Sequence, residues 1–176
     1  LDFEEALLER VSGFKGHSAS ISERVLRERI TFMPGGAVLL ATMKANGGHA
    51  ALVSGGFTAF TEKVANSLGF DEHHGNTLLI EKDLLTGKVS RPILGRQAKV
   101  DALEKITSQL KIKASDVMAV GDGANDLGML GRAGMGVALH AKPSVAAECD
   151  VRINFGDLTA LLFLQGYSRQ KFVEPD

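Results

Sequence analysis

The sequence predicts an α/β domain built on a parallel sheet, because short apolar runs alternate with segments of helical periodicity. Residues 117–120 and 136–139 are four-residue runs of largely apolar side chains, as expected of strands that are buried on both faces. The helical segments between such strands supply the crossover that parallel pairing requires. The expected fold class is therefore a three-layer, Rossmann-like α/β architecture.

The remaining elements follow from periodicity and from residues that begin or end helices. We expect helices over residues 1–14, 18–30, 37–46, 57–68, 95–110, 127–132, 143–148 and 157–164. We expect strands over residues 49–53, 117–120, 136–139 and 150–153, and a β-hairpin over about residues 75–92 with its turn at 84–87. Ser18 or Ser20 is expected to cap the second helix, and Asp157 the last. These elements predict a helical cap over residues 1–33, an α/β core over 34–164 and a tail over 165–176.

The composition is that of an ordinary globular chain. The 176 residues carry a formal net charge of −1 without a block of like charge, so no nucleic acid and no membrane surface is expected as a partner. No apolar run approaches the roughly 18 residues that suggest a membrane span. The single cysteine, Cys149, has no partner for an internal disulfide and is expected to pack in the core, which favours a cytoplasmic location.

The most informative stretch is the polar turn over residues 121–126, which follows an expected strand and leads into a helix. The Asp122 and Asp126 carboxylates and the Asn125 amide lie beyond the carboxyl end of a strand, where ligands bind in open α/β sheets. Glycines allow the backbone to approach a ligand closely, and Mg²⁺ prefers carboxylates together with phosphate oxygens. The alternative is a solvated turn that only caps the helix. The whole run favours the ligand site.

A second polar turn, Ser54–Gly56, follows the expected strand at 49–53. A serine hydroxyl and backbone N–H groups beside a helix start suit a phosphate group. The residues allow equally that Ser54 only caps the helix that follows. Farther on, His73 and His74 would point to opposite sides of a strand, so we expect surface or turn residues there rather than a metal site.

Two basic residues lie on amphipathic helices, where such side chains are ordinarily solvated. Lys99 lies in the first turns of the helix over 95–110. Arg10 follows Phe3 by seven residues, which places both on nearly the same side of the first helix. Periodicity alone assigns a function to neither of them.

Taken together, several motifs resemble the phosphoserine phosphatases of the haloacid-dehalogenase (HAD) superfamily. In chain order they are Val53–Phe57, Leu85–Lys88, Gln97–Lys99, Ala119–Leu127, Ala141–Pro143 and Asp157–Leu161. The resemblance covers the chain from its Leu-Asp-Phe-Glu-Glu start to about Leu164. It implies a HAD-like core with a small helical cap and a hairpin. It also implies Mg²⁺-dependent hydrolysis of O-phospho-L-serine to L-serine and phosphate, the last step of serine synthesis.

The resemblance further implies how the phosphoryl group is handled. In the family, one aspartate of an Asp-x-Asp-x-(Thr/Ser) motif attacks phosphorus and becomes an aspartyl phosphate. The second aspartate protonates the leaving serine and then activates water. Ser54 and the Gly55 amide would bind the phosphoryl group, and Lys99 would hold both the phosphate and the attacking carboxylate.

The resemblance assigns five more residues. Asp122 would bind Mg²⁺, and Asn125 would position the phosphoryl group or the ligands around the metal. Asp126 would orient the lysine and support the turn. Phe3 and Arg10 match the family's substrate-contacting pair, in which Arg10 would bind the serine carboxylate through two parallel hydrogen bonds.

The sequence departs from the family at one point, since it contains no Asp-x-Asp-x-Thr or Asp-x-Asp-x-Ser motif. This chain therefore lacks the nucleophile, the general acid and one metal ligand. It also lacks the first strand, which carries them and is central in the family's sheet. Three explanations for the missing motif compete: its segment was removed, its segment is disordered, or the protein is a natural relative without the nucleophile. Because the other motifs are intact, we favour a fragment. We expect this chain alone to be inactive. Its unpaired sheet edges favour a homodimer or a retained, cleaved N-terminal segment.

Two rival functions stay open. Another small-molecule phosphatase of the superfamily would share the motifs but would not depend on Arg10. A non-catalytic module that binds phosphate or Mg²⁺ would account for the missing nucleophile. The retained set of Ser54, Lys99 and Asp122 favours an enzyme.

Overall fold

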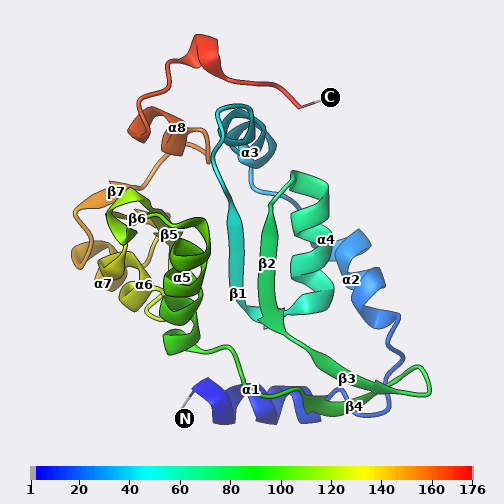
Figure 1. Ribbon diagram of the computed structural model, residues 1–176. Helices are drawn as coiled ribbons and strands as arrows, with labels where there is room; N and C mark the ends of the chain where they lie inside the picture. Colours follow the sequence, from blue (N-terminus) through cyan, green and yellow to red (C-terminus); the bar gives the residue numbers. More distant parts are fainter. Residues whose placement is uncertain (1–2, 176) are drawn as a thin grey trace. The chain divides into compact units, whose positions relative to one another are not determined.

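The computed structural model describes residues 3–175 and has the alternation of helices and parallel strands that the sequence predicts (Figure 1). The chain forms two compact units. Unit 1 comprises Leu1–Ile93 and Asp157–Asp176, and unit 2 comprises Leu94–Gly156. None of the described helices is both long and apolar enough to span a membrane. The α/β class is confirmed, whereas the division into a cap over 1–33 and a core over 34–164 stays a prediction.

Unit 1 is built on two parallel strands, β1 (Ala51–Phe57) and β2 (Glu72–Asn76), which are joined by helix α4 (Thr58–Leu68). Its other elements are α1 (Phe3–Ser12), α2 (Ile21–Arg29), α3 (Gly36–Ala45), β3 (Leu78–Glu81), β4 (Leu84–Val89), α8 (Ala160–Leu164) and the 3-10 helix η2 (Arg169–Lys171). Strand β1 is longer than expected, because the polar turn at 54–56 forms its irregular end. The pairing register shifts there, between Val53 and Phe57.

Strand β2 corrects the sequence-based assignment, which placed only a hairpin in this part of the chain. Its residues are polar, so neither alternation nor an apolar run marks it as a strand. The hairpin itself is formed by β3 and β4, and the expected turn at 84–87 is wrong. The turn lies at Lys82 and Asp83, whose φ angles are 50° and 62°. Positive φ at both residues is what a two-residue hairpin turn of type I′ requires.

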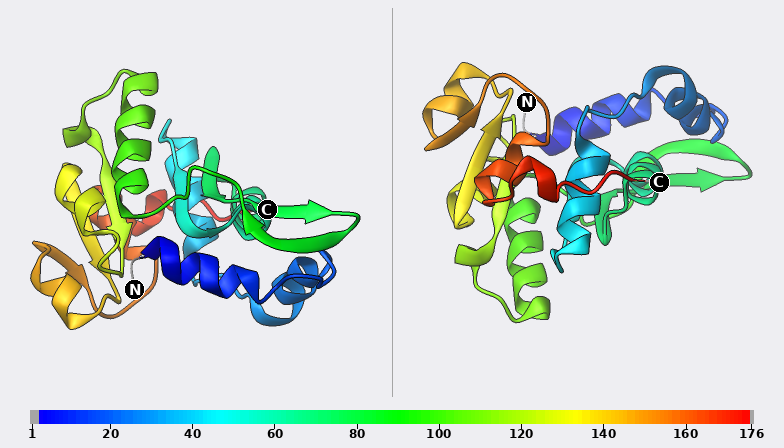
Figure 2. Two further views of the ribbon diagram at one scale, coloured as in Figure 1. Left: turned by 90° about the horizontal axis from the view of Figure 1, so that it is seen from below. Right: turned by 90° about the horizontal axis from the view of Figure 1, so that it is seen from above.

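Helix α1 packs on the hairpin and on the end of β1. Val11 is fully buried in a cluster with Val89, against which Phe57 packs. The rings of Phe14 and Phe57 meet edge to face, with their centroids 6.4 Å apart. In both views of Figure 2, the C-terminal end of α1 lies beside the base of the hairpin. This packing ties the first helix to the strand end that carries the 54–56 turn.

Neither of the two expected side-chain caps, at the start of α2 and of α8, is formed. Ser20 precedes α2, but its hydroxyl lies 2.8 Å from that of Ser18 and makes no hydrogen bond to the helix. Asp157 lies before α8, whose N-cap residue is Thr159. The Thr159 hydroxyl and backbone N–H donate to the Asp157 carboxylate and lower its pKa below the ordinary value. Both residues stabilise the chain before the helix rather than the helix end itself.

The C-terminal segment, expected only as a tail, is docked on α3. The backbone N–H of Val173 donates to the hydroxyl oxygen of Thr42 at 2.9 Å. Thr42 is completely buried, and the Phe172 ring packs against Phe163 with centroids 5.1 Å apart. A buried hydroxyl therefore anchors residues that have no periodicity of their own.

Replacing Thr42 with valine is expected to loosen this segment without unfolding the protein. Valine keeps the shape of threonine but cannot accept the Val173 hydrogen bond, which contributes about 0.5–1.5 kcal/mol. Hydrogen exchange at the Val173 amide should accelerate by up to about tenfold, while exchange in strand β5 (Met118–Gly121) of unit 2 stays unchanged. Equal exchange at Val173 in the two proteins would show that the hydroxyl does not anchor the segment.

Unit 2 is a three-stranded parallel sheet in the order β5–β6–β7. Its elements are α5 (Arg96–Leu110), the 3-10 helix η1 (Ala114–Asp116), β5 (Met118–Gly121), α6 (Leu127–Arg132), β6 (Met135–Leu139), α7 (Pro143–Ala147) and β7 (Val151–Ile153). The expected elements of this unit are confirmed to within one residue at each end. Cys149 is buried in the core with Leu103 and Leu130, as expected.

Each parallel sheet ends in a strand with a strand neighbour on one side only. Within residues 3–175, β1 pairs only with β2, and β5 pairs only with β6. The N–H and C=O groups on an open strand edge are a template for another strand. Strands β1 and β5 are therefore edge strands within the described residues, as β2 and β7 are at the other edges of the two sheets.

Candidate functional site

A buried ion pair between Lys99 and Asp126 is the centre of the polar site in unit 2. Lys99 lies on α5 with 7% of its surface exposed, and Asp126 precedes α6 with 3% exposed. The Lys99 ammonium donates a hydrogen bond to Oδ1 of Asp126. A buried ammonium requires such a partner, because an unpaired charge is costly away from water. Lys99 is therefore not the solvated lysine that periodicity alone suggests, and the expected contact with Asp126 is present.

The second oxygen of Asp126 holds the 121–126 turn. Oδ2 accepts the backbone N–H groups of Asp122 at 3.2 Å and Gly123 at 3.1 Å. These amides are thereby occupied by the protein's own carboxylate rather than offered to a ligand. A Cβ at Gly121 would lie 2.5 Å from the Cβ of Asp126, so only glycine allows this approach. The helix-cap alternative does not describe Asp126, which makes no side-chain cap bond to α6.

Asp122 and Asn125 lie in the same turn with more exposure to solvent. Asp122 is exposed, and the structure records no hydrogen bond or ion pair of its carboxylate with any residue in 3–175. This suits one Mg²⁺ ligand, since Mg²⁺ at phosphoryl-transfer sites takes one or two carboxylates, with waters and phosphate oxygens completing the shell. No group of three His, Cys, Asp or Glu side chains among the described residues could hold a metal by itself.

The Ser54–Gly56 turn in unit 1 has its own internal hydrogen bonds. The hydroxyl oxygen of Ser54 accepts the Gly56 N–H at 3.0 Å. The N-cap residue of α4 is Phe57, and no side chain caps this helix, so the helix-cap alternative for Ser54 is wrong. The carbonyl oxygen of Gly55 accepts a hydrogen bond from the side-chain amide of Asn76 at 2.9 Å.

Asn76 was missed by the sequence analysis. It ends β2 with only 2% of its surface exposed. The polar run at 72–74 conceals that strand, although a strand was to be expected after α4, because a strand–helix pair in a parallel sheet is normally followed by another strand. A Gly-Asn pair following that helix is the signal that could have drawn attention to it.

Phe3 and Arg10 lie on α1 in unit 1. Phe3 is 40% exposed, and Arg10 is also exposed. The structure records no ion pair for Arg10 within residues 3–175, whereas the nearby Glu4 pairs with Arg91 at 2.6 Å. The Arg10 guanidinium is thus accessible to a carboxylate from solution.

The expected site residues are divided between the two units. Unit 1 holds Phe3, Arg10, Ser54 and Gly55, and unit 2 holds Lys99, Asp122, Asn125 and Asp126. The structure brings Asp126 together with Lys99 in unit 2, and it places Gly55 against Asn76 in unit 1. The catalytic and binding roles of these residues stay predictions.

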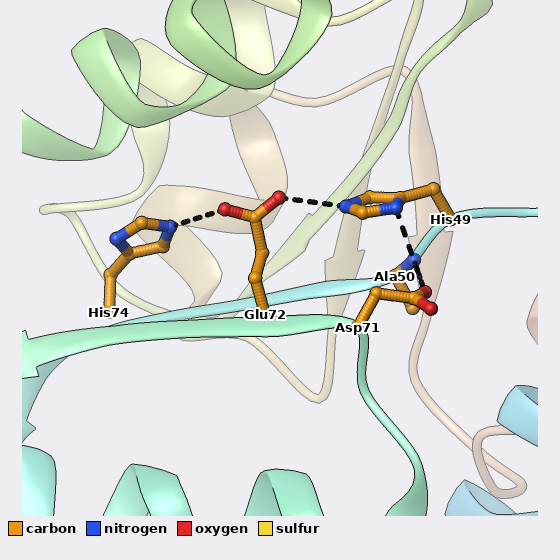
Figure 3. A network of polar contacts seen from close by, with 5 residues as sticks. All are labelled: His49, Ala50, Asp71, Glu72 and His74. Atoms are coloured by element: carbon orange, nitrogen blue, oxygen red, sulfur yellow. Dashed lines mark hydrogen bonds and ion pairs between the residues drawn. The ribbon is translucent and has the colours of Figure 1, made fainter. Parts of the chain in front are cut away.

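His73 and His74 lie on β2 and point to opposite sides of it. His73 contacts the Thr61 hydroxyl on α4 at 3.0 Å. The Glu72 carboxylate lies between two imidazole rings, 2.8 Å from Nε2 of His74 and 2.7 Å from Nε2 of His49 (Figure 3). Burial raises the pKa of the Glu72 carboxyl, but hydrogen bonds and positive charge from both histidines lower it by more, to below its ordinary value of 4.5.

Glu72 is expected to make stability depend on acid pH. Because its pKa is lower in the folded protein, the carboxylate stabilises the fold above its unfolded pKa, and this contribution is lost as the pH falls through the folded value. Near neutral pH, Glu72→Gln should lower the free energy of unfolding by about 0.2–1 kcal/mol. Urea titrations should show that difference shrinking below pH 4.5. Glu81→Gln, which removes an exposed carboxylate of β3, is the control, and a pH-independent effect of Glu72→Gln would contradict the assignment.

Comparison with known proteins places these features in a family. The sequence model of the haloacid dehalogenase-like hydrolases matches residues 1–131. The chain belongs to this hydrolase family. Its relatives include the phosphoserine phosphatase of Streptomyces coelicolor, 38% identical over 100% of this chain and 43% of the relative. Another is the phosphoserine phosphatase of a Polaromonas species, 42% identical over 93% of this chain and 71% of the relative. The resemblance inferred from the motifs is confirmed.

Solved structures agree with this assignment. The chain superimposes on an unliganded probable phosphoserine phosphatase from Vibrio cholerae with a TM-score of 0.86 and 39% identity, covering 96% of this chain and 54% of that one. A substrate-bound phosphoserine phosphatase gives a TM-score of 0.87 and 36% identity, over 93% of this chain and 78% of that one. The chain spans between 43% and 74% of the length of eight curated relatives that it matches.

Proposed function

We propose that this chain is part of a cytoplasmic, Mg²⁺-dependent phosphoserine phosphatase, which hydrolyses O-phospho-L-serine to L-serine and phosphate. The observation that carries the proposal is the buried Lys99–Asp126 pair beside the exposed Asp122, in a chain whose relatives bear that name. A preorganised ammonium can neutralise charge on phosphoryl oxygens without having to be desolvated when substrate arrives.

Five residues handle the phosphoryl group in this proposal. The Ser54 hydroxyl and the Gly55 N–H bind its oxygens, Lys99 neutralises their charge and Asn125 positions the group. Asp122 is the Mg²⁺ ligand that this chain contributes. When bound, the metal supplies further positive charge that polarises the phosphoryl group.

Phe3 and Arg10 recognise the serine portion of the substrate. The exposed Arg10 guanidinium presents two parallel donors that match a carboxylate. Phe3, about two helical turns earlier on α1, covers the substrate from the same side of the helix. Because phosphate esters without a carboxylate would gain nothing from Arg10, this contact distinguishes phosphoserine from other small phosphates.

The chemical step requires carboxylates that this sequence does not contain. The first aspartate of the family's motif attacks phosphorus, the bond from phosphorus to the serine oxygen breaks, and that oxygen takes a proton from the second aspartate. Water then hydrolyses the aspartyl phosphate and regenerates the carboxylate. We infer that a retained segment with this motif adds a strand at the open edge of β1 or β5, or that this edge is covered in a homodimer of the chain. Without the motif, the 176 residues are inactive in either form.

Intact mass spectrometry of the denatured protein, paired with a phosphoserine hydrolysis assay, tests this arrangement. The expected result is turnover only when a second species with an Asp-x-Asp-x-(Thr/Ser) segment accompanies the chain. Substantial turnover by the 176 residues alone would refute the proposed mechanism, because the covalent intermediate would have no carboxylate on which to form.

Calorimetry with the chain tests the substrate. Arg10→Ala should weaken phosphoserine binding by about 10- to 100-fold, the value of a charge-assisted bidentate pair, and leave inorganic phosphate binding unchanged. Arg27→Ala is the matched control, since Arg27 is an exposed arginine of α2 paired only weakly with Glu28 at 3.8 Å. Unchanged phosphoserine affinity in Arg10→Ala would favour another phosphatase of the family.

The missing motif favours one further candidate, a non-catalytic relative that binds phosphate or Mg²⁺. That candidate predicts phosphate binding but no turnover even when the longer protein is intact. The hydrolysis assay on the longer protein therefore separates it from the enzyme.

A further inference from the structure

We propose that Asn76 is a positioning residue that aims the Ser54 hydroxyl at the phosphoryl group, acting through the Gly55–Gly56 peptide. The inference rests on the proposed function, because it assumes that Ser54 binds phosphate. The inference adds Asn76, a residue of the neighbouring strand β2, to the binding site. The sequence motifs assign no role in binding to this residue.

Two consecutive hydrogen bonds connect Asn76 to Ser54. The side-chain amide of Asn76 donates to the carbonyl oxygen of Gly55, and the N–H of Gly56 donates to the hydroxyl oxygen of Ser54. That carbonyl and that N–H belong to one peptide group, which is planar and normally trans. Fixing the carbonyl therefore fixes the direction of the N–H.

This arrangement leaves the Ser54 hydroxyl free to donate its proton to a ligand. A serine hydroxyl has one proton to donate and two lone pairs. Since the Gly56 N–H occupies a lone pair, it orients the oxygen, and the proton stays available for a phosphoryl oxygen. Hydrogen bonds in such a chain polarise one another, so the donor from Asn76 also strengthens the hydroxyl as a donor.

The surroundings make this a rigid frame. Asn76 is almost fully buried and lies opposite Phe57, just past the register shift that makes the 54–56 turn. A Cβ at the preceding Gly75 would lie 3.1 Å from the Thr58 nitrogen and 3.2 Å from the Gly56 oxygen. The end of β2 thus presses directly against the turn, and a glycine followed by an asparagine is what fits there.

The test is a double-mutant cycle on the affinity of the chain for inorganic phosphate. Asn76→Ala should weaken phosphate binding by about five- to tenfold, the effect of one neutral hydrogen bond. Ser54→Ala should weaken it by at least as much. In the Ser54→Ala background, Asn76→Ala should have almost no further effect, because its influence passes through the hydroxyl. A purely structural role would weaken binding equally in both backgrounds, and that result would overturn the proposal.

Asn46 provides the matched control. Its side-chain amide also donates to a backbone carbonyl, that of Thr42 at 2.8 Å, but it ends α3 rather than contacting the turn. Asn46→Ala removes the same kind of hydrogen bond at an exposed position and should leave phosphate affinity unchanged. If wild-type protein does not bind phosphate, the proposed function fails together with this inference. If it binds and Asn76→Ala binds equally well, only the inference fails.

Nuclear magnetic resonance on wild-type protein decides the matter even where Asn76→Ala does not fold. The side-chain NH₂ signals of Asn76 should shift as inorganic phosphate is added, while those of Asn46 stay in place. Phosphate that shifts the Ser54 and Gly55 amide signals but leaves the Asn76 side chain unaffected would contradict the relay.

Discussion

Asp126→Asn is expected to lower the free energy of unfolding by about 3–5 kcal/mol, the usual effect of leaving one member of a buried ion pair without its partner. Asparagine has nearly the same volume, so the substitution removes the charge and leaves the packing. Lys99, with 7% of its surface exposed, would then keep an uncompensated ammonium away from water. The 121–126 turn would also lose the carboxylate that accepts two of its amides. Urea denaturation measures the change.

A neighbouring ion pair provides the control. Arg132 and Glu104 also connect α6 with α5, at 3.0 Å, but each side chain is 52% exposed. Glu104→Gln should cost no more than about 1 kcal/mol, because water screens exposed pairs. The double variant Lys99→Met with Asp126→Asn should recover part of the stability but none of the phosphate affinity. If Asp126→Asn cost as little as Glu104→Gln, the pair would not be buried in solution.

Gly136→Ala is expected to lower the free energy of unfolding by about 3 kcal/mol or more, the upper range for overpacking. Gly136 lies on β6 directly beneath α6. A Cβ there would lie 2.8 Å from the carbonyl carbon of Leu130 and 3.1 Å from its Cα, and closer still to the carbonyl oxygen. Backbone atoms cannot move aside as a side chain can, so α6 would have to shift. Because Asp126 begins that helix, phosphate affinity should fall as well.

Gly131→Ala is the matched substitution on α6 itself. Nothing lies within 4 Å of a Cβ at Gly131, and the residue is exposed within the helix. Alanine there should raise the free energy of unfolding by about 0.4–1 kcal/mol through lower entropy of the unfolded chain. Thermal unfolding of the two variants should therefore move in opposite directions, and parallel shifts would show that the clash at Gly136 is relieved at little cost.

Much of unit 2 could be predicted from the sequence, because its strands are apolar and its helices strongly periodic. The bounds of α6 agree with the expected ones, and those of α5 differ at one end by one residue. Unit 1 was harder. Strand β2 carries Glu72, His73 and His74 in place of an apolar run, since polar contacts hold these side chains on both sides of the strand. Polar contacts of this kind produce no periodic pattern in the sequence from which the strand could be recognised.

The candidate site, too, was predictable from the sequence only in part. The contact between Lys99 and Asp126 follows from the motifs, but the burial that makes it strong depends on how α5 and α6 pack. The use of the Asp122 and Gly123 amides by Asp126 is a matter of three-dimensional geometry, and so is the contact of Asn76 with Gly55. Residues far apart in sequence acquire these roles only through tertiary structure.

The order of the two units along the chain has a consequence for protein synthesis. Unit 2 is one continuous stretch, so all of its residues are present once Gly156 has been added. Unit 1 is interrupted, and its second part returns to the first through a Leu158–Pro34 backbone bond at 3.1 Å and the Val173–Thr42 bond across 131 residues. A ribosome adds about 5–20 residues per second, which is slow compared with the formation of helices and hairpins. Unit 2 can therefore fold first, while unit 1 waits until its second part, Asp157–Asp176, has left the ribosome.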